Sequence, residues 1–176
     1  PFANSGIVVQ INPEDIPGDD PLRGLAYQEA LETLAYQEAM QCMNNQESKE
    51  NAAPAQRLRD FVEGKTSHTL PNCSYLPGIL PSRLDQWLPP HIGKRLQQGF
   101  RDFDRKYPGF LTNDAIIVGV ESRSSSAVRI PRDPDTLQSI STPNLYPCGE
   151  GAGYAGGITS SALDGINAAL KIAGIK

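Results

Sequence analysis

The sequence predicts a mixed fold of the α/β class, in which short strands and longer helices alternate with loops. Runs of β-branched residues bounded by turn residues, at 7–11 and 115–121, are typical of strands. Two longer segments, 22–43 and 88–107, carry apolar residues at helical spacing. The 16 glycines and 15 prolines among 176 residues exceed average usage, so loops and turns should take a large share of the chain.

Composition argues against several classes of protein. With 16 Lys and Arg against 20 Asp and Glu, the net charge is −4, whereas nucleic-acid binders normally carry a basic face. Hydrophobic residues make up 39% of the chain, which allows a core and argues against wholesale disorder. The longest apolar runs are short, as at 115–118, while a transmembrane helix needs about 20 apolar residues. We therefore expect neither a nucleic acid nor a membrane as partner.

The first residues and the cysteines bear on the protein's origin. The chain starts at Pro1 without a charged and apolar leader, so we expect no signal peptide and interpret it as a fragment of a longer protein. A processed mature protein is the alternative. Cys42, Cys73 and Cys148 lie far apart without a CxxC pair, which indicates reduced thiols and a cytoplasmic location. Two histidines are too few for most zinc sites, so no metal site is expected.

The first half of the chain is predicted to be mainly helical after one strand. The strand at 7–11 is followed by a helix at 22–43 and by a polar surface loop at 44–53. A short helix is predicted at 54–63, where a glycine follows it. The proline-rich segment 67–81 is expected to form an extended, ordered loop.

The second half is predicted to combine strands, turns and helices. The helix at 88–107 begins near a Pro-Pro pair and ends at Pro-Gly. Three strands are predicted after it, at 115–121, 127–130 and 144–148. The last strand leads into the glycine-rich segment 149–157, which a helix at about 160–172 follows.

The segment 149–157 is the clearest functional signal, with five glycines in nine residues. Such a loop lets a ligand approach the backbone, and its N–H groups and the following helix attract anionic or electron-rich groups. The alternative is a glycine-rich connection without a ligand. The spacing Gly151-x-Gly153-x-x-Gly156 matches the dinucleotide fingerprint, but the 20 residues after Gly156 leave room for only one helix. We therefore expect no self-contained Rossmann site.

The stretch 143–158, Pro-Asn-Leu-Tyr-Pro-Cys-Gly-Glu-Gly-Ala-Gly-Tyr-Ala-Gly-Gly-Ile, resembles the C-terminal flavin-contacting segment of FAD-dependent oxidoreductases. In particular, it resembles the bacterial family of NAD(FAD)-utilizing dehydrogenases, and the stretches 119–132 and 160–165 fit the same pattern. Residues 1–110 resemble part of the cap or substrate domain that this family inserts into its flavin domain. Residues 111–176 would then supply the C-terminal strand, glycine-rich loop and helix of an FAD/NAD(P)-binding fold.

The resemblance implies a C-terminal fragment of a flavoprotein dehydrogenase, an oxidoreductase that passes a hydride through FAD. NAD(P)H is a candidate electron donor. The implied partners are FAD, a small-molecule substrate and the N-terminal remainder of the same chain, because the N-terminal fingerprint that holds the FAD diphosphate is absent here. The isolated fragment is therefore expected to be inactive and to bind FAD weakly. The sequence identifies neither the substrate nor the catalytic residues, and the alternative is a non-redox ligand-binding or interaction module that uses the same loop.

The resemblance assigns six residues to the cofactor. They are Gly149, Glu150, Gly151, Gly156, Gly157 and Ile158. It implies that the Glu150 carboxylate accepts hydrogen bonds from the ribityl hydroxyls of the flavin; the alternative is a solvated turn residue. It also implies that backbone amides at 156–158 lie beside the pyrimidine edge of the ring, where donors stabilise the anionic reduced flavin.

Five neighbouring side chains are each open to two interpretations. A Ser-x-x-Asp pattern ending at Asp164 is typical of a capping box, so we predict that Asp164 caps the last helix rather than takes part in catalysis. Cys148 is predicted to be a small core residue rather than a redox thiol. Tyr154 either shields the flavin or packs within the protein. Arg123 and Arg129 either face an anionic group or form surface ion pairs.

Overall fold

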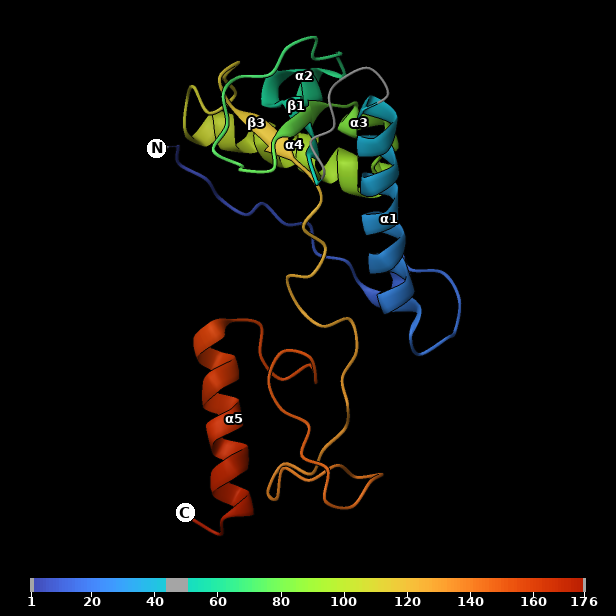
Figure 1. Ribbon diagram of the computed structural model, residues 1–176, viewed down its shortest axis with the longest axis vertical. Helices are drawn as coiled ribbons and strands as arrows, with labels where there is room; N and C mark the ends of the chain where they lie inside the picture. Colours follow the sequence, from blue (N-terminus) through green and yellow to red (C-terminus); the bar gives the residue numbers. More distant parts are fainter. Residues whose placement is uncertain (1, 44–50, 176) are drawn as a thin grey trace. The chain divides into compact units, whose positions relative to one another are not determined.

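The computed structural model describes residues 2–43 and 51–175 and confirms the mixed α/β class. Within those residues it contains five α-helices, a short 3-10 helix, η1 (Pro13–Asp15), and one sheet of three strands (Figure 1). In this described part of the chain, none of the helices has both the length and the apolar character needed to cross a membrane.

Contacts between residues divide the chain into two compact units, which are described separately. Unit 1 comprises Pro1–Asn12 and Glu29–Val120, and unit 2 comprises Pro13–Gln28 and Glu121–Lys176. Helix α1 (Arg23–Met43) confirms the helix predicted at 22–43 and contributes residues to both units. The domain boundary expected between residues 110 and 111 stays a prediction, because contacts within this chain alone do not define the domains of a longer protein.

The sheet of unit 1 is small and mixed. Its strands are β1 (Ala53–Arg57), β2 (Ile79–Pro81) and β3 (Ile116–Val118), and β1 lies in the centre. Strand β1 runs parallel to β2 and antiparallel to β3, with Ala53 opposite Ile79 and Arg57 opposite Ile116. The strand predicted at 115–121 is thus confirmed in its first half.

Three helices pack with this sheet to form the core of unit 1 (Figure 1). They are α2 (Leu58–Glu63), α3 (Leu84–Trp87) and α4 (Pro90–Lys106), the last of which confirms the helix predicted at 88–107. The fully buried Phe61 ring meets the Phe100 ring edge-on, with centroids 6.1 Å apart. The buried apolar residues are Leu58, Phe61, Val62, Leu84, Leu88 and Phe100.

Two predictions for unit 1 are wrong and one lies outside the described residues. Residues 7–11 form no strand, because no other strand in the described residues pairs with them. The helix predicted at 54–63 begins only at Leu58, since the preceding residues form the central strand β1, whose hydrogen bonds come from distant parts of the chain. Most of the polar loop predicted at 44–53 lies outside the described residues.

Unit 2 contains little regular structure besides α5 (Ile158–Ile172), which confirms the helix predicted at about 160–172. The strands predicted at 127–130 and 144–148 are absent; among the described residues, unit 2 has only an isolated bridge between Arg132 and Ser139. Backbone groups in these runs bond to turns instead, as where the Ser139 amide donates to the Leu145 carbonyl at 2.7 Å. A run of β-branched residues does not form a strand by itself, because a strand needs a neighbouring strand that accepts and donates its backbone hydrogen bonds.

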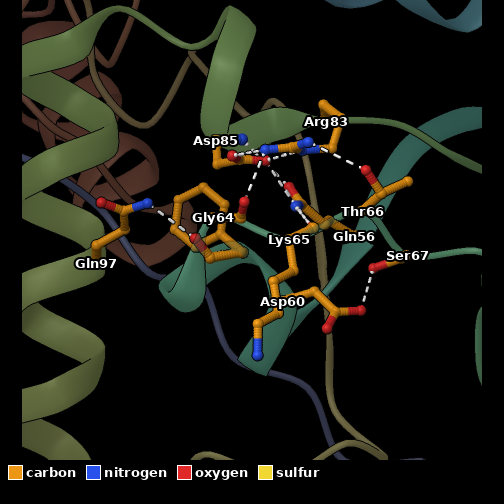
Figure 2. A network of polar contacts seen from close by, with 10 residues as sticks. Gln56, Asp60, Gly64, Lys65, Thr66, Ser67, Arg83, Asp85 and Gln97 are labelled. Carbon is orange, nitrogen blue, oxygen red and sulfur yellow. Dashed lines mark hydrogen bonds and ion pairs between the residues drawn. The ribbon is translucent and has the colours of Figure 1, made fainter.

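A buried polar network joins the loop after α2 to helix α3 (Figure 2). The fully buried Gln56 side chain donates through Nε2 to the Lys65 carbonyl at 2.8 Å and to the Asp85 carboxylate at 2.6 Å. Arg83 donates to both carboxylate oxygens of Asp85, at 2.7 and 2.6 Å, and to the Gly64 carbonyl at 2.9 Å. Buried polar groups are tolerated when they are paired in this way, and the pairing fixes the position of the loop.

The charge of Asp85 is maintained by its partners. Burial raises the pKa of Asp85, but hydrogen bonds from Arg83 and Gln56 outweigh that effect, and the pKa lies below its ordinary value. The ionised carboxylate is therefore the form that the network requires at neutral pH.

We predict that Asp85→Ala lowers the free energy of unfolding of unit 1 by about 3 kcal/mol, because Gln56 loses its acceptor and Arg83 loses its partner. Denaturant unfolding can be followed through the fluorescence of Trp87, the single tryptophan of the chain, which packs against the core. The matched control is Asp102→Ala, which breaks the exposed ion pair with Arg105 and should leave stability nearly unchanged. Equal losses for the two variants would contradict the structural role of the network.

Candidate functional site

The six residues assigned to a cofactor from the sequence all lie in unit 2, in the segment 149–158 that leads into α5. Gly149 is buried, whereas the other five are exposed, and Ile158 is 94% exposed. The segment is therefore anchored at Gly149 and accessible along most of its remaining backbone.

The first part of the segment forms a turn that closes on itself. The Gly153 amide donates to the Glu150 carbonyl at 2.9 Å, and the Tyr154 amide donates to the Gly149 carbonyl at 3.0 Å. Gly153 has a φ of +80°, and a Cβ added there would lie 2.5 Å from the Val128 carbonyl oxygen. Both the backbone conformation and the close approach of a neighbouring segment thus require glycine at this position.

The second part of the segment starts helix α5. The Gly157 amide donates to Ser160 Oγ at 3.2 Å, and Ser160 Oγ donates back to the Gly157 carbonyl at 3.0 Å, so Ser160 caps the helix. The prediction that Asp164 caps α5 is wrong, because the helix begins earlier and Asp164 lies in its second turn. The first-turn amides of Ile158 and Thr159 have no acceptor among the described residues, as is usual at a helix N-terminus.

Asp164 instead anchors the buried end of the segment. Arg132 donates to both of its carboxylate oxygens, at 2.7 and 2.9 Å, and the Gly149 amide donates to Asp164 Oδ2 at 2.9 Å. The side chains of Arg132 and Asp164 are only 10% and 16% exposed. The hydrogen bond from Arg132, aided by the Gly149 amide, lowers the pKa of Asp164 below its ordinary value.

Arg132 also contacts the two ends of the turn. Its Nη1 donates to the Pro147 carbonyl at 2.8 Å, and its guanidinium carbon lies 3.6 Å from the centre of the Tyr154 ring. The Tyr154 hydroxyl accepts from the Arg132 amide at 3.1 Å and donates to the Ile130 carbonyl at 3.0 Å. Tyr154 therefore packs within unit 2, in agreement with one of its two interpretations.

The segment before Arg132 runs alongside the same turn. Arg129 donates through Nε to the Gly153 carbonyl at 3.0 Å, and the Ile130 amide donates to the Ala152 carbonyl at 3.2 Å. The Arg129 side chain thus holds the turn by its hydrogen bond to the backbone of Gly153.

The prediction that Cys148 is a core residue is wrong: Cys148 is exposed, since the buried strand expected at this position does not form.

The sequence alone did not indicate the assembly of Arg132, Tyr154 and Asp164. No short motif connects Arg132 with Asp164, because the two residues are 32 positions apart. The signal available in the sequence was compositional: an arginine in a polar turn and an aspartate in an apolar helix are both residues that need a partner when buried.

Within the described residues, no group of three or more His, Cys, Asp or Glu side chains could hold a metal ion.

Comparison with known proteins identifies the family. Residues 1–124 match the family model described as FAD-dependent protein, C-terminal domain-like. The chain is also 40% identical over 172 residues to an uncharacterized protein of Clostridium beijerinckii, an alignment that covers 97% of this chain and 31% of that relative. The chain therefore belongs to the FAD-dependent protein C-terminal domain-like family, and it spans about a third of the length of this curated relative. The family match covers unit 1 and ends before the glycine-rich segment.

The exposed part of the segment fits a cofactor such as FAD. A Cβ added at Gly151 would meet nothing within 4 Å, and one added at Gly156 would lie 3.8 Å from its nearest neighbour, so the backbone is open to close approach. The amides of Ile158 and Thr159 are donors for carbonyl oxygens or anions. The exposed Glu150 carboxylate has no partner among the described residues and is an acceptor for hydroxyl groups.

We predict that Gly153→Ala destabilises unit 2 by about 1–3 kcal/mol, because alanine must adopt a positive φ and its Cβ overlaps Val128. Gly151→Ala is the matched control, since it adds the same methyl group two residues away in open space. Thermal unfolding of the two variants measures the difference. Similar melting temperatures for both would show that the turn does not hold the conformation described.

The paired Asp164 predicts a dependence of stability on pH. Because its pKa is lower in the folded state than the value of about 4 in an unfolded chain, its contribution is complete above pH 4. The contribution is lost as the pH falls through the folded-state pKa. The stability difference between wild type and Asp164→Asn should therefore be constant near neutral pH and shrink below about pH 4. Denaturant unfolding at a series of pH values tests this, and a difference that widens on acidification would contradict it.

Proposed function

We propose that the chain is the C-terminal part of an FAD-dependent oxidoreductase whose segment 149–158 contacts the flavin. Membership of the FAD-dependent protein C-terminal domain-like family supports an association with FAD. The observation that carries the proposal is the arrangement of the segment: it is anchored internally at Gly149, while its remaining predicted cofactor residues are exposed. When bound, FAD supplies the hydride-transfer chemistry at its N5 atom.

Different residues of the segment would contact different parts of the flavin. The Glu150 carboxylate would accept hydrogen bonds from the ribityl hydroxyls, for which it is exposed and unpartnered among the described residues. The backbone amides at 156–158, together with the positive end of α5, would lie beside the pyrimidine edge of the ring. Donors at that position stabilise negative charge on the reduced cofactor and thereby favour its acceptance of electrons.

The remainder of the polypeptide would complete the enzyme. Helix α5 exposes Leu163, Ile166 and Leu170, which share one face at helical spacing and are 57%, 55% and 36% exposed. The relative from Clostridium beijerinckii is about three times as long as the aligned region. We therefore propose that a preceding domain covers this apolar face and supplies the contacts to the diphosphate and adenine. Residues 1–110, as part of the cap or substrate domain, would contribute to the binding of the small-molecule substrate, and NAD(P)H is the candidate electron donor.

The flavin absorbance of the purified full-length protein tests the function directly. A protein that is yellow, or that becomes so after addition of FAD, is the expected result. A colourless full-length protein that takes up no FAD would contradict the oxidoreductase proposal and favour a non-redox module that uses the same loop.

In the full-length protein, Glu150→Ala should weaken FAD binding by roughly 10- to 150-fold, because hydrogen bonds to a charged acceptor contribute about 1.5–3 kcal/mol. Glu150→Gln keeps an acceptor and should cost less. Titration of the apoprotein with FAD, followed by flavin fluorescence, gives the dissociation constants. Asp135→Ala removes another exposed carboxylate of unit 2 and is the matched control. Wild-type affinity in Glu150→Ala would remove Glu150 from the site.

A further inference from the structure

We propose that Arg132 is a positioning residue for FAD, because it holds the turn at 149–154 in the conformation that binds the cofactor. The inference rests on the proposed function, in which FAD contacts the segment 149–158. It concerns Arg132, Tyr154 and Asp164, which are not among the six residues assigned to the cofactor.

A single guanidinium group joins three parts of the chain. Its bond to the Pro147 carbonyl fixes the backbone before the turn, and its stacking on Tyr154 fixes the residue at the end of the turn. Its two bonds to Asp164 fix helix α5, and Asp164 in turn accepts from the Gly149 amide. The beginning of the turn, its end and the helix are therefore joined through Arg132.

The exposed residues of the turn depend on these fixed ends. The Glu150 side chain makes no hydrogen bond among the described residues, and the Gly151 carbonyl accepts one of 3.4 Å from Ser126 Oγ. Glycine also loses more backbone freedom on ordering than any other residue. If the ends were released, FAD binding would have to order the turn, and that ordering would weaken the measured affinity. Loss of Arg132 should thus weaken FAD binding although Arg132 need not touch FAD.

The contacts of Arg132 require the shape of arginine as well as its charge. A planar guanidinium can bond to two carboxylate oxygens and a carbonyl while it stacks on an aromatic ring, whereas a lysine ammonium is a compact point charge. Arg132→Lys therefore keeps the charge and removes the geometry. This substitution separates positioning from a general electrostatic effect of a cation near FAD.

The experiment uses the full-length protein and four variants: Arg132→Lys, Asp164→Asn, the double variant, and Arg105→Lys as control. The control alters the exposed ion pair of Arg105 with Asp102 on α4, which belongs to unit 1. FAD affinity is measured by titration of each apoprotein. Cleavage of the apoprotein by chymotrypsin after Tyr154 is measured in parallel, because it reports the order of the turn without any cofactor.

We expect each single variant to weaken FAD binding by about tenfold or more, as for the loss of a hydrogen bond to a charged group. The double variant should lose less than the sum of the two single variants, because both substitutions break the pair that Arg132 forms with Asp164. Cleavage after Tyr154 should become faster in all three, and the control should match the wild type. Where Arg132→Lys fails to fold, Tyr154→Leu removes the aromatic ring on which the Arg132 guanidinium stacks, and it should still weaken binding several-fold.

Wild-type FAD affinity in folded Arg132→Lys or Tyr154→Leu would overturn the inference, even if these variants unfolded at lower temperature. Additive losses in the double variant would also overturn it. Failure of the proposed function gives a different result, since the wild-type protein itself would then take up no FAD.

Discussion

The ion pair between Arg132 and Asp164 is the interaction on which the order of unit 2 depends most. In the described residues, the buried hydrophobic residues of this unit are two alanines, Ala152 and Ala168. Two buried methyl groups cannot offset the conformational entropy of a segment with so little regular structure. Charge-assisted hydrogen bonds from a shielded guanidinium, together with its stacking on Tyr154, therefore take the place of an apolar core.

Unit 1 is organised on the opposite principle. Its core is a cluster of large apolar side chains around Phe61 and Phe100, and its fully buried polar side chain, Gln56, is paired with the Asp85 carboxylate. The family match at 1–124 covers unit 1 and part of unit 2, whereas the exposed backbone donors at 156–158 lie in unit 2 outside the matched residues.

The helices could be predicted from the sequence, but most strands could not. Helical periodicity is a local property, and the helices at 22–43, 88–107 and 160–172 were placed within a few residues of their observed ends. Strand formation depends on a distant partner, and the β-branched runs at 127–130 and 144–148 have none among the described residues. Local sequence could not indicate whether such a partner would be available.

In the candidate site, too, local features could be predicted from the sequence but contacts between distant segments could not. The concentration of glycines identified the segment 149–157, because unusual composition is visible in the sequence alone. The local Ser-x-x-Asp pattern suggested a helix cap at Asp164, but a partner 32 positions away, Arg132, determines what that carboxylate does. Gly153 could not be distinguished from Gly151 by sequence, since the positive φ of Gly153 and its proximity to Val128 both arise from the fold. Contacts between distant segments thus decide which residues of a recognisable segment are structural and which remain exposed.

Hydrogen–deuterium exchange of the full-length protein, with and without FAD, tests most directly whether the exposed segment is the contact with the cofactor. We expect FAD to slow exchange at 150–158, most strongly at the amides of 156–158, and to leave α4 of unit 1 unchanged. Unchanged exchange at 150–158 in saturating FAD, shown to be bound by its absorbance, would contradict a contact between this segment and the flavin.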